Sequence, residues 1–141
     1  MSWIPAPVDE LLAAALVCEM TVVGAKGQPV THPLLPLWDG ERIYVTSSVL
    51  FSRKVEHIKR DGKVSVAITD PVACGGLATR CAVQGDARVF EDDPHETLTR
   101  ILPLFFERSL IEITPRRVLW WEDGNVESAP SVATPEGAGH G

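Results

Sequence analysis

Hydroxyl and cationic residues gather in one short stretch of the chain, residues 44–54, in an order that suits phosphate binding. The hydroxyl residues are Thr46, Ser47, Ser48 and Ser52, and the cations that follow are Arg53 and Lys54. A helix is expected to begin here, and a helix N-terminus offers an anion free backbone N–H groups and the positive end of the dipole. Arg53 can hold two phosphate oxygens at once, while Lys54 adds a point charge. The stretch is therefore a candidate anion site.

A second interpretation of this stretch needs no ligand. Ser52 would cap the helix and the two cations would belong to a solvated face, and spacing alone does not separate the two interpretations. The chain as a whole is acidic, with 13 Lys and Arg against 19 Asp and Glu and a net charge of −6. Such a charge argues against a general nucleic-acid binder, which needs a basic surface. A local group of cations stands out against this background.

The segments around the candidate site have the alternating pattern and the turn residues of antiparallel β-strands. Extended segments are expected at residues 16–23, 30–38, 42–46, 64–69, 79–90, 110–113 and 117–121. Residues 25–28 and Asp39-Gly40 supply hairpin turns, and Gly85 is placed for a β-bulge. The strands follow one another without the regular helices of βαβ units. A closed or nearly closed antiparallel barrel is predicted.

Short helices flank the predicted barrel. One is expected at residues 8–14, and a second at residues 51–60, where apolar residues recur at i, i+4 and i+7 opposite a charged face. A third starts at Asp93, which can cap it ahead of Pro94 at the first helical position. Pro103 should kink or end this third helix. The helices are thus expected to cover the barrel rather than to alternate with its strands.

Composition indicates one soluble domain. The last segment is rich in Ala, Pro, Gly and Ser without periodicity, so we predict a domain over residues 1–124 and a disordered tail over residues 125–141. The apolar run near the N-terminus is too short to span a bilayer, and no membrane association is expected. Cys18, Cys74 and Cys81 are odd in number and lack the spacing of a metal site, which favours a reducing cytoplasm and no bound metal.

The order of these segments resembles the pyridoxamine 5′-phosphate oxidase family. Residues 44–54 are similar to the family's strand that ends in Tyr-Thr-Asn and is followed by Ser-Arg-Lys. Residues 64–69 look like its next strand, and residues 79–89 contain the polar-Val-x-Gly pattern that recurs in the strand after that. The resemblance extends over about residues 16–121. It implies a mainly β fold, a six- to seven-stranded antiparallel split β-barrel with short flanking helices.

The resemblance also implies a cofactor, FMN or the deazaflavin F420, held between the two subunits of a homodimer. The residues implied to bind it are Thr31, His32, Pro33, Leu34, Thr46, Ser47, Ser48, Ser52, Arg53, Lys54, Arg80 and Gln84. Arg53 and Lys54 would pair with the phosphate, and Thr46 and Ser47 would face the ribityl chain and the phosphate. The strand over residues 31–37 would lay its backbone along the isoalloxazine ring. Arg80 or Gln84 would come from the second subunit.

Two departures from the family pattern affect the expected activity. The family's C-terminal Arg-x-His, which helps to hold its substrate, is replaced by Arg116-Arg117 and a Trp pair, so slow or absent turnover of pyridoxamine phosphate is expected. Thr31-His32 stand where the family usually has an Arg, so the ring edge would be contacted differently. The predicted function is an FMN-binding oxidoreductase for an unknown small molecule, since the flavin supplies the chemistry. An F420-dependent reductase and a non-catalytic flavin- or heme-binding module are the alternatives.

Overall fold

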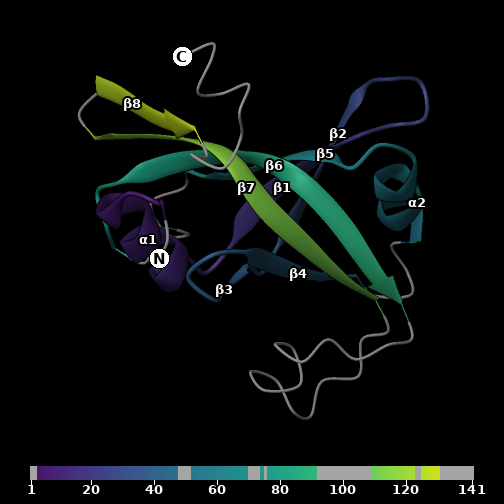
Figure 1. Ribbon diagram of the computed structural model, residues 1–141, viewed down its shortest axis with the longest axis horizontal. Helices are drawn as coiled ribbons and strands as arrows, with labels where there is room; N and C mark the ends of the chain where they lie inside the picture. The colour runs from purple at the N-terminus through teal and green to yellow at the C-terminus, as the bar shows by residue number, and fades with distance from the viewer. Residues whose placement is uncertain are drawn as a thin grey trace.

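Antiparallel pairing joins most of the chain into one curled sheet (Figure 1). The computed structural model describes residues 3–47, 52–69, 74, 76–91, 109–122 and 125–130. The strands are β1 (Cys18–Val23), β2 (Pro29–Leu34), β3 (Leu37–Trp38), β4 (Ile43–Ser47), β5 (Lys63–Ile68), β6 (Arg80–Glu91), β7 (Ser109–Glu122) and β8 (Asn125–Pro130). Their order in the sheet is β2-β1-β5-β6-β7-β4-β3, with β8 paired to β7. The predicted mainly β, antiparallel barrel-type fold is confirmed.

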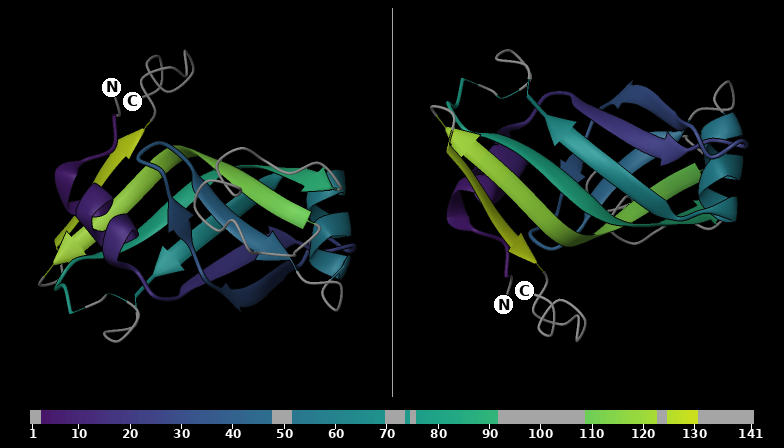
Figure 2. Two further views of the ribbon diagram at one scale, coloured as in Figure 1. Left: turned by 90° about the horizontal axis from the view of Figure 1, so that it is seen from below. Right: turned by 90° about the horizontal axis from the view of Figure 1, so that it is seen from above.

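The two edge strands of this sheet, β2 and β3, are neighbours in the chain. Only Leu35 and Pro36 separate them, so the chain itself links the two edges and the sheet curls into a half-barrel (Figure 2). An edge strand tolerates proline, because the missing N–H is not needed by a second neighbour, and β2 contains both Pro29 and Pro33. The segment predicted as one strand over residues 30–38 is therefore divided, because Pro36 cannot donate to a ladder.

Two helices in the described part of the chain cover opposite ends of the barrel (Figure 2). They are α1 (Ala6–Ala14) and α2 (Ser52–Arg60), close to the helices predicted at residues 8–14 and 51–60. α1 buries Val8, Leu11 and Leu12 in the main apolar core, and α2 adds Ile58, which is only 3% exposed. Neither helix is long and apolar enough to cross a membrane.

Gly85 marks a β-bulge in the ladder between β6 and β7, as the sequence predicted. Gly85 pairs with Pro115, and the register shifts beside this pair, which leaves Arg116 as the extra residue on β7. A Cβ atom on residue 85 would press against the carbonyl oxygen of Thr114. A side chain at this position would push the two strands apart, so glycine is required.

β7 is one long strand where the sequence predicted two, at residues 110–113 and 117–121. Pro115 lies between the two predicted strands but does not divide β7. On the edge of β7 that faces away from β6, the partner strand before Pro115 differs from the one after it. β4 pairs with residues 109–113 and β8 with residues 117–122, so the missing N–H of Pro115 interrupts neither ladder.

The tail was predicted to be disordered from residue 125, but its first six residues form the strand β8. β4 leaves the second half of β7 without a partner on that side, and such an edge can recruit any chain segment by backbone hydrogen bonds. No apolar periodicity is needed for this pairing, which is why β8 could not be predicted from the residue pattern. Residues 131–141 and the helix predicted from Asp93 lie outside the described residues.

Candidate functional site

The end of β4 leads into α2 as the candidate anion site requires. β4 ends at Ser47 and α2 begins at Ser52, which puts Arg53 and Lys54 in the first turn of the helix. The predicted step from strand to helix is confirmed in the backbone. The side chains of Thr46, Ser47, Ser52, Arg53 and Lys54, and all of Ser48, lie outside what the structure describes. Their contacts with a phosphate stay a prediction.

The rest of α2 is also cationic. Its nine residues hold four Lys and Arg but one acid, Glu56, whose Oε1 lies 3.8 Å from Nζ of Lys59. Arg60 donates a hydrogen bond of 2.6 Å to Nδ1 of His57, a half-buried residue that was expected to face solvent. The helix therefore places positive charge at one end of an acidic protein, which favours the approach of anions.

β2 carries the residues predicted to lie along the flavin ring, and one of its edges is free. Within the described sheet β2 pairs with β1 alone, so the N–H and C=O groups on its other side have no strand partner. His32 and Leu34 are half-buried, and Thr31 and Pro33 are exposed. Leu35, which follows them, is 59% exposed. An edge of this kind can form hydrogen bonds with a flat polar ring.

Arg80 and Gln84, predicted to reach the cofactor from a second subunit, have different surroundings on β6. Nη1 of Arg80 donates to the carbonyl oxygens of Leu77 (2.6 Å) and Thr79 (3.0 Å), so this side chain holds the loop before β6. Gln84 is exposed on the outer face. α2 packs near the other end of β6. There the N–H of Ala87 donates a hydrogen bond to the carbonyl oxygen of Gly62, just after the end of α2. Arg80 is thus about 23 Å along the strand from α2.

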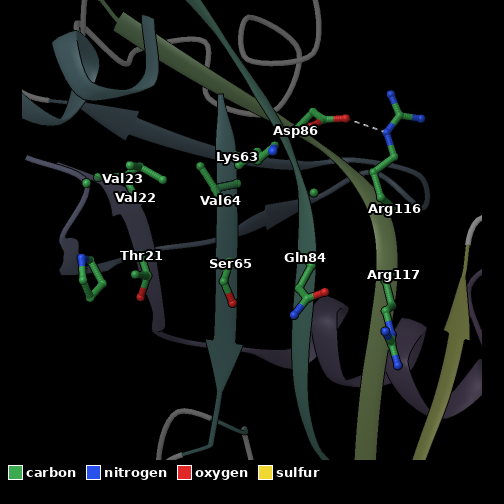
Figure 3. Close-up of a pocket in the computed structure, with 13 residues that line it drawn as sticks. Thr21, Val22, Val23, Lys63, Val64, Ser65, Gln84, Asp86, Arg116 and Arg117 are labelled. Atoms are coloured by element: carbon green, nitrogen blue, oxygen red, sulfur yellow. Dashed lines mark hydrogen bonds and ion pairs between the residues drawn. The ribbon is translucent and has the colours of Figure 1, made fainter. Parts of the chain in front are cut away.

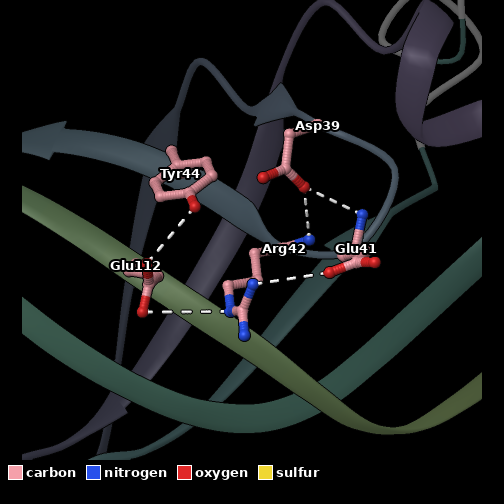
Figure 4. Close-up of polar contacts among 5 residues, drawn as sticks. All are labelled: Asp39, Glu41, Arg42, Tyr44 and Glu112. Carbon is pink, nitrogen blue, oxygen red and sulfur yellow. Dashed lines mark hydrogen bonds and ion pairs between the residues drawn. The ribbon is translucent and has the colours of Figure 1, made fainter. Parts of the chain in front are cut away.

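Tyr44 connects β4 to β7 beside the candidate anion site (Figure 4). Its hydroxyl donates to Oε2 of Glu112 at 3.2 Å, and Nε of Arg42 lies 4.0 Å from Oε1 of the same carboxylate. The preceding turn is closed by Oδ1 of Asp39, which accepts the N–H groups of Glu41 (2.8 Å) and Arg42 (2.7 Å). The Asp39-Gly40 hairpin predicted from the sequence is confirmed. These contacts fix the strand that leads to α2.

The three cysteines belong to the core. Cys18, Cys74 and Cys81 are all buried and free of disulfides. Burial raises the pKa of Cys18 and of Cys81 to about 12, so both stay protonated at neutral pH and are poor nucleophiles. No group of three His, Cys, Asp or Glu side chains in the described part of the chain is placed to hold a metal ion. Packing is the role that the structure supports for these thiols.

A groove lies on the outer face of the sheet, and Gln84 is the one residue of its described lining that the sequence analysis placed in a binding site (Figure 3). It has a volume of about 520 Å³ and crosses β1, β5, β6 and β7. The residues that line it are Thr21, Val22, Val23, Gly27, Pro29, Lys63, Val64, Ser65, Gln84, Gly85, Asp86, Arg116 and Arg117. We call it the outer groove. Strand alternation could have shown which of these residues face outward, but only the register across four strands brings them together.

Comparison with known proteins gives one family. The family model for pyridoxamine 5′-phosphate oxidase matches residues 4–122. No curated protein sequence matches the chain. Solved structures match over most of its length, and the three compared below are 12–22% identical to it, which establishes a shared fold.

Three of these structures differ in the ligand that their descriptions name. An FMN-binding, pyridoxamine 5′-phosphate oxidase-related protein from Nostoc punctiforme has a TM-score of 0.62 at 12% identity, over 87% of this chain and 90% of its own. An F420 reductase has a TM-score of 0.64 at 22% identity, over 82% and 98%. A heme-binding protein from Mycobacterium smegmatis has a TM-score of 0.64 at 19% identity, over 90% and 59%.

Proposed function

Because the chain belongs to the pyridoxamine 5′-phosphate oxidase family, we propose that it is an FMN-binding oxidoreductase acting on a small organic substrate. The observation that carries the proposal is the step from β4 to α2, which puts Arg53 and Lys54 in the first turn of a helix. A phosphate at this point meets free N–H groups, the positive end of the helix dipole and two cations.

The free edge of β2 fits the ring end of the same cofactor. A flavin ring has a uracil-like edge of alternating donors and acceptors, and the outer edge of β2, which pairs with no second strand of the described sheet, offers backbone N–H and C=O groups that alternate in the same way. Pro33 has no N–H, so only its carbonyl takes part. Leu35 exposes apolar surface beside this edge, which suits the apolar part of the ring. Bound FMN supplies the electron and hydride transfer, and the protein positions it and excludes water.

A homodimer completes this proposal. The largest exposed apolar side chains are Leu16 (54%), Val17 (43%) and Leu35 (59%) among the described residues. Cys18 pairs with Leu34, so the three flank the same end of the β1–β2 ladder. Exposed apolar surface beside a cofactor edge is typical of a surface that a partner covers. The three free thiols are consistent with a cytoplasmic protein.

The alternative cofactor is F420, which also carries a phosphate that the start of α2 could bind. The similarity of the fold to that of an F420 reductase makes this alternative specific. Both cofactors would use the same helix, so the geometry of α2 does not separate them. A direct comparison of the two ligands does.

The test is a titration of the full-length protein with FMN, riboflavin and F420, followed by fluorescence and calorimetry. FMN or F420 should bind in the low micromolar range or tighter. Riboflavin, which lacks the phosphate, should bind at least about tenfold more weakly. If neither phosphate-bearing cofactor binds at high micromolar concentration, the proposed function is wrong. Tight binding of hemin alone would favour the heme-binding alternative.

A further inference from the structure

The outer groove is separate from the proposed cofactor site. None of its described lining residues belongs to β4, to α2 or to residues 31–37, and Gln84 alone was among the residues implied to bind the cofactor, as one of two candidates from a second subunit. Its volume of about 520 Å³ lies in the range of small-molecule sites, roughly 300 to 1,000 Å³. Its floor is the outer face of four paired strands, which is a rigid surface (Figure 3). The outer groove is therefore a preformed space that the proposed function does not use.

Four polar residues form a straight row across the outer groove. Thr21 pairs with Ser65, Ser65 with Gln84, and Gln84 with Arg117. Neighbouring strands lie about 4.8 Å apart, so the row is about 14 Å long. The hydroxyl of Thr21 is held by Thr31 at 2.8 Å on the next strand. An elongated ligand lying along the row would meet two hydroxyls, an amide and a guanidinium in turn.

The charge of the outer groove is positive. Its ionisable lining residues are Lys63, Asp86, Arg116 and Arg117. Nε of Arg116 and Oδ2 of Asp86 form an ion pair of 2.8 Å, so these two charges offset each other. Among the residues that the structure describes, no carboxylate pairs with the side chain of Lys63 or Arg117. Two cations therefore face the groove of a chain whose net charge is −6.

The remaining walls of the outer groove are apolar. Val23 and Pro29 contribute carbon surface, and Gly27 at the β1–β2 turn leaves the rim open. We infer that the outer groove binds an elongated organic anion with an apolar body. The carboxylate, sulfonate or phosphate group of this ligand pairs with Arg117, and the charge of Lys63 adds further attraction. A charged end and an apolar body match the two kinds of surface in the groove.

Two fluorescent probes of similar shape test this inference on the full-length protein saturated with FMN. Anilinonaphthalene sulfonate carries the acidic group, and N-phenyl-1-naphthylamine lacks it. Arg117→Gln should weaken sulfonate binding about tenfold and Lys63→Gln about threefold, while the neutral probe changes less than about twofold. Lys26→Gln, which removes a charge from the β1–β2 turn outside the groove, should leave both affinities unchanged.

A variant that fills the groove gives a second test. Ser65→Phe places a ring on the floor of the outer groove, on a face that tolerates aromatic residues, and should abolish binding of both probes. Equal probe affinities in the parent, Arg117→Gln and Ser65→Phe proteins would overturn the inference. Displacement of the sulfonate probe when FMN is titrated into the FMN-free protein would assign the groove to the cofactor, against the inference. Dissociation of a dimer by Ser65→Phe in sedimentation would also overturn it, because the groove would then be a subunit interface.

Discussion

The two candidate sites of this protein are built in different ways. The β4–α2 step is local, since eight residues from Ser47 to Lys54 contain a strand end, a helix start and two cations. The outer groove is made of residues from four strands, and Thr21 and Arg117 come to line the same groove only through the sheet register. A sequence motif can therefore reveal the first site, while the second needs the fold. Substitutions should affect the two sites separately.

The largest effect is expected from Gly85→Ala, which disturbs the outer groove and leaves α2 in place. The new Cβ would press against the Thr114 carbonyl, a backbone atom that cannot turn away. We expect the free energy of unfolding to fall by about 3 kcal/mol in urea titrations. At a temperature where the variant is folded, anilinonaphthalene sulfonate binding should be lost and FMN binding kept. Equal loss of both would show that the two sites are coupled.

Arg53→Ala is expected to have the opposite selectivity. Loss of a charge-assisted hydrogen bond of roughly 1.5 to 3 kcal/mol should weaken FMN affinity about ten- to a hundredfold. Riboflavin affinity and anilinonaphthalene sulfonate affinity should hardly change. Lys54→Ala should act in the same direction but less, and Lys59→Ala, one turn further along α2, is the control. If all three variants weaken FMN and riboflavin equally, the start of α2 is not a phosphate site.

The buried thiols, which line neither site, predict how the common core responds to alkali. The ordinary pKa of a cysteine is about 9 and burial raises that of Cys18 and Cys81 to about 12. Between these values the unfolded chain loses protons that the folded protein keeps, so stability is complete below pH 9 and falls above it.

We expect each thiol to lower the free energy of unfolding by about 1 kcal/mol at pH 10 relative to pH 8. Urea titrations at the two pH values measure the difference. Cys81→Ala should lose less stability over this interval than the parent, whatever its stability at pH 8. An unchanged loss would mean that other groups cause the alkaline effect. Thiol reagents should label the protein only after unfolding.

The smallest effect is expected from Tyr44→Phe, beside the β4–α2 step. The change removes a hydrogen bond to Glu112 from a side chain that is 3% exposed. The free energy of unfolding should fall by about 1 kcal/mol. Thr31→Val, which removes an exposed hydrogen bond to Thr21, should cost less than about 0.5 kcal/mol. A loss of FMN affinity greater than about twofold in Tyr44→Phe would show that the hydrogen bond from Tyr44 to Glu112 helps to position the cofactor.

Local features of the fold were predictable from the sequence. The Asp39-Gly40 turn, the bulge at Gly85 and the start of α2 each depend on a few adjacent residues with strong backbone preferences. β8 and the unbroken β7 were missed, because both depend on which edge of a strand another strand leaves free. The local hydrogen bonds of Arg80 were missed as well, since they depend on a loop geometry that no motif specifies.

The pairing of β4 with β7 has a consequence for the order of folding. Ile43 pairs with Ile113, so β4 finds its main partner only after most of the chain has left the ribosome. The ladders β1–β2 and β5–β6 connect nearer segments and can form earlier. During synthesis the edge of β4 that pairs with β7 therefore stays without its partner strand until β7 has been made. The ladder that holds the strand before the proposed phosphate site is thus complete only after residues 109–113 have been added.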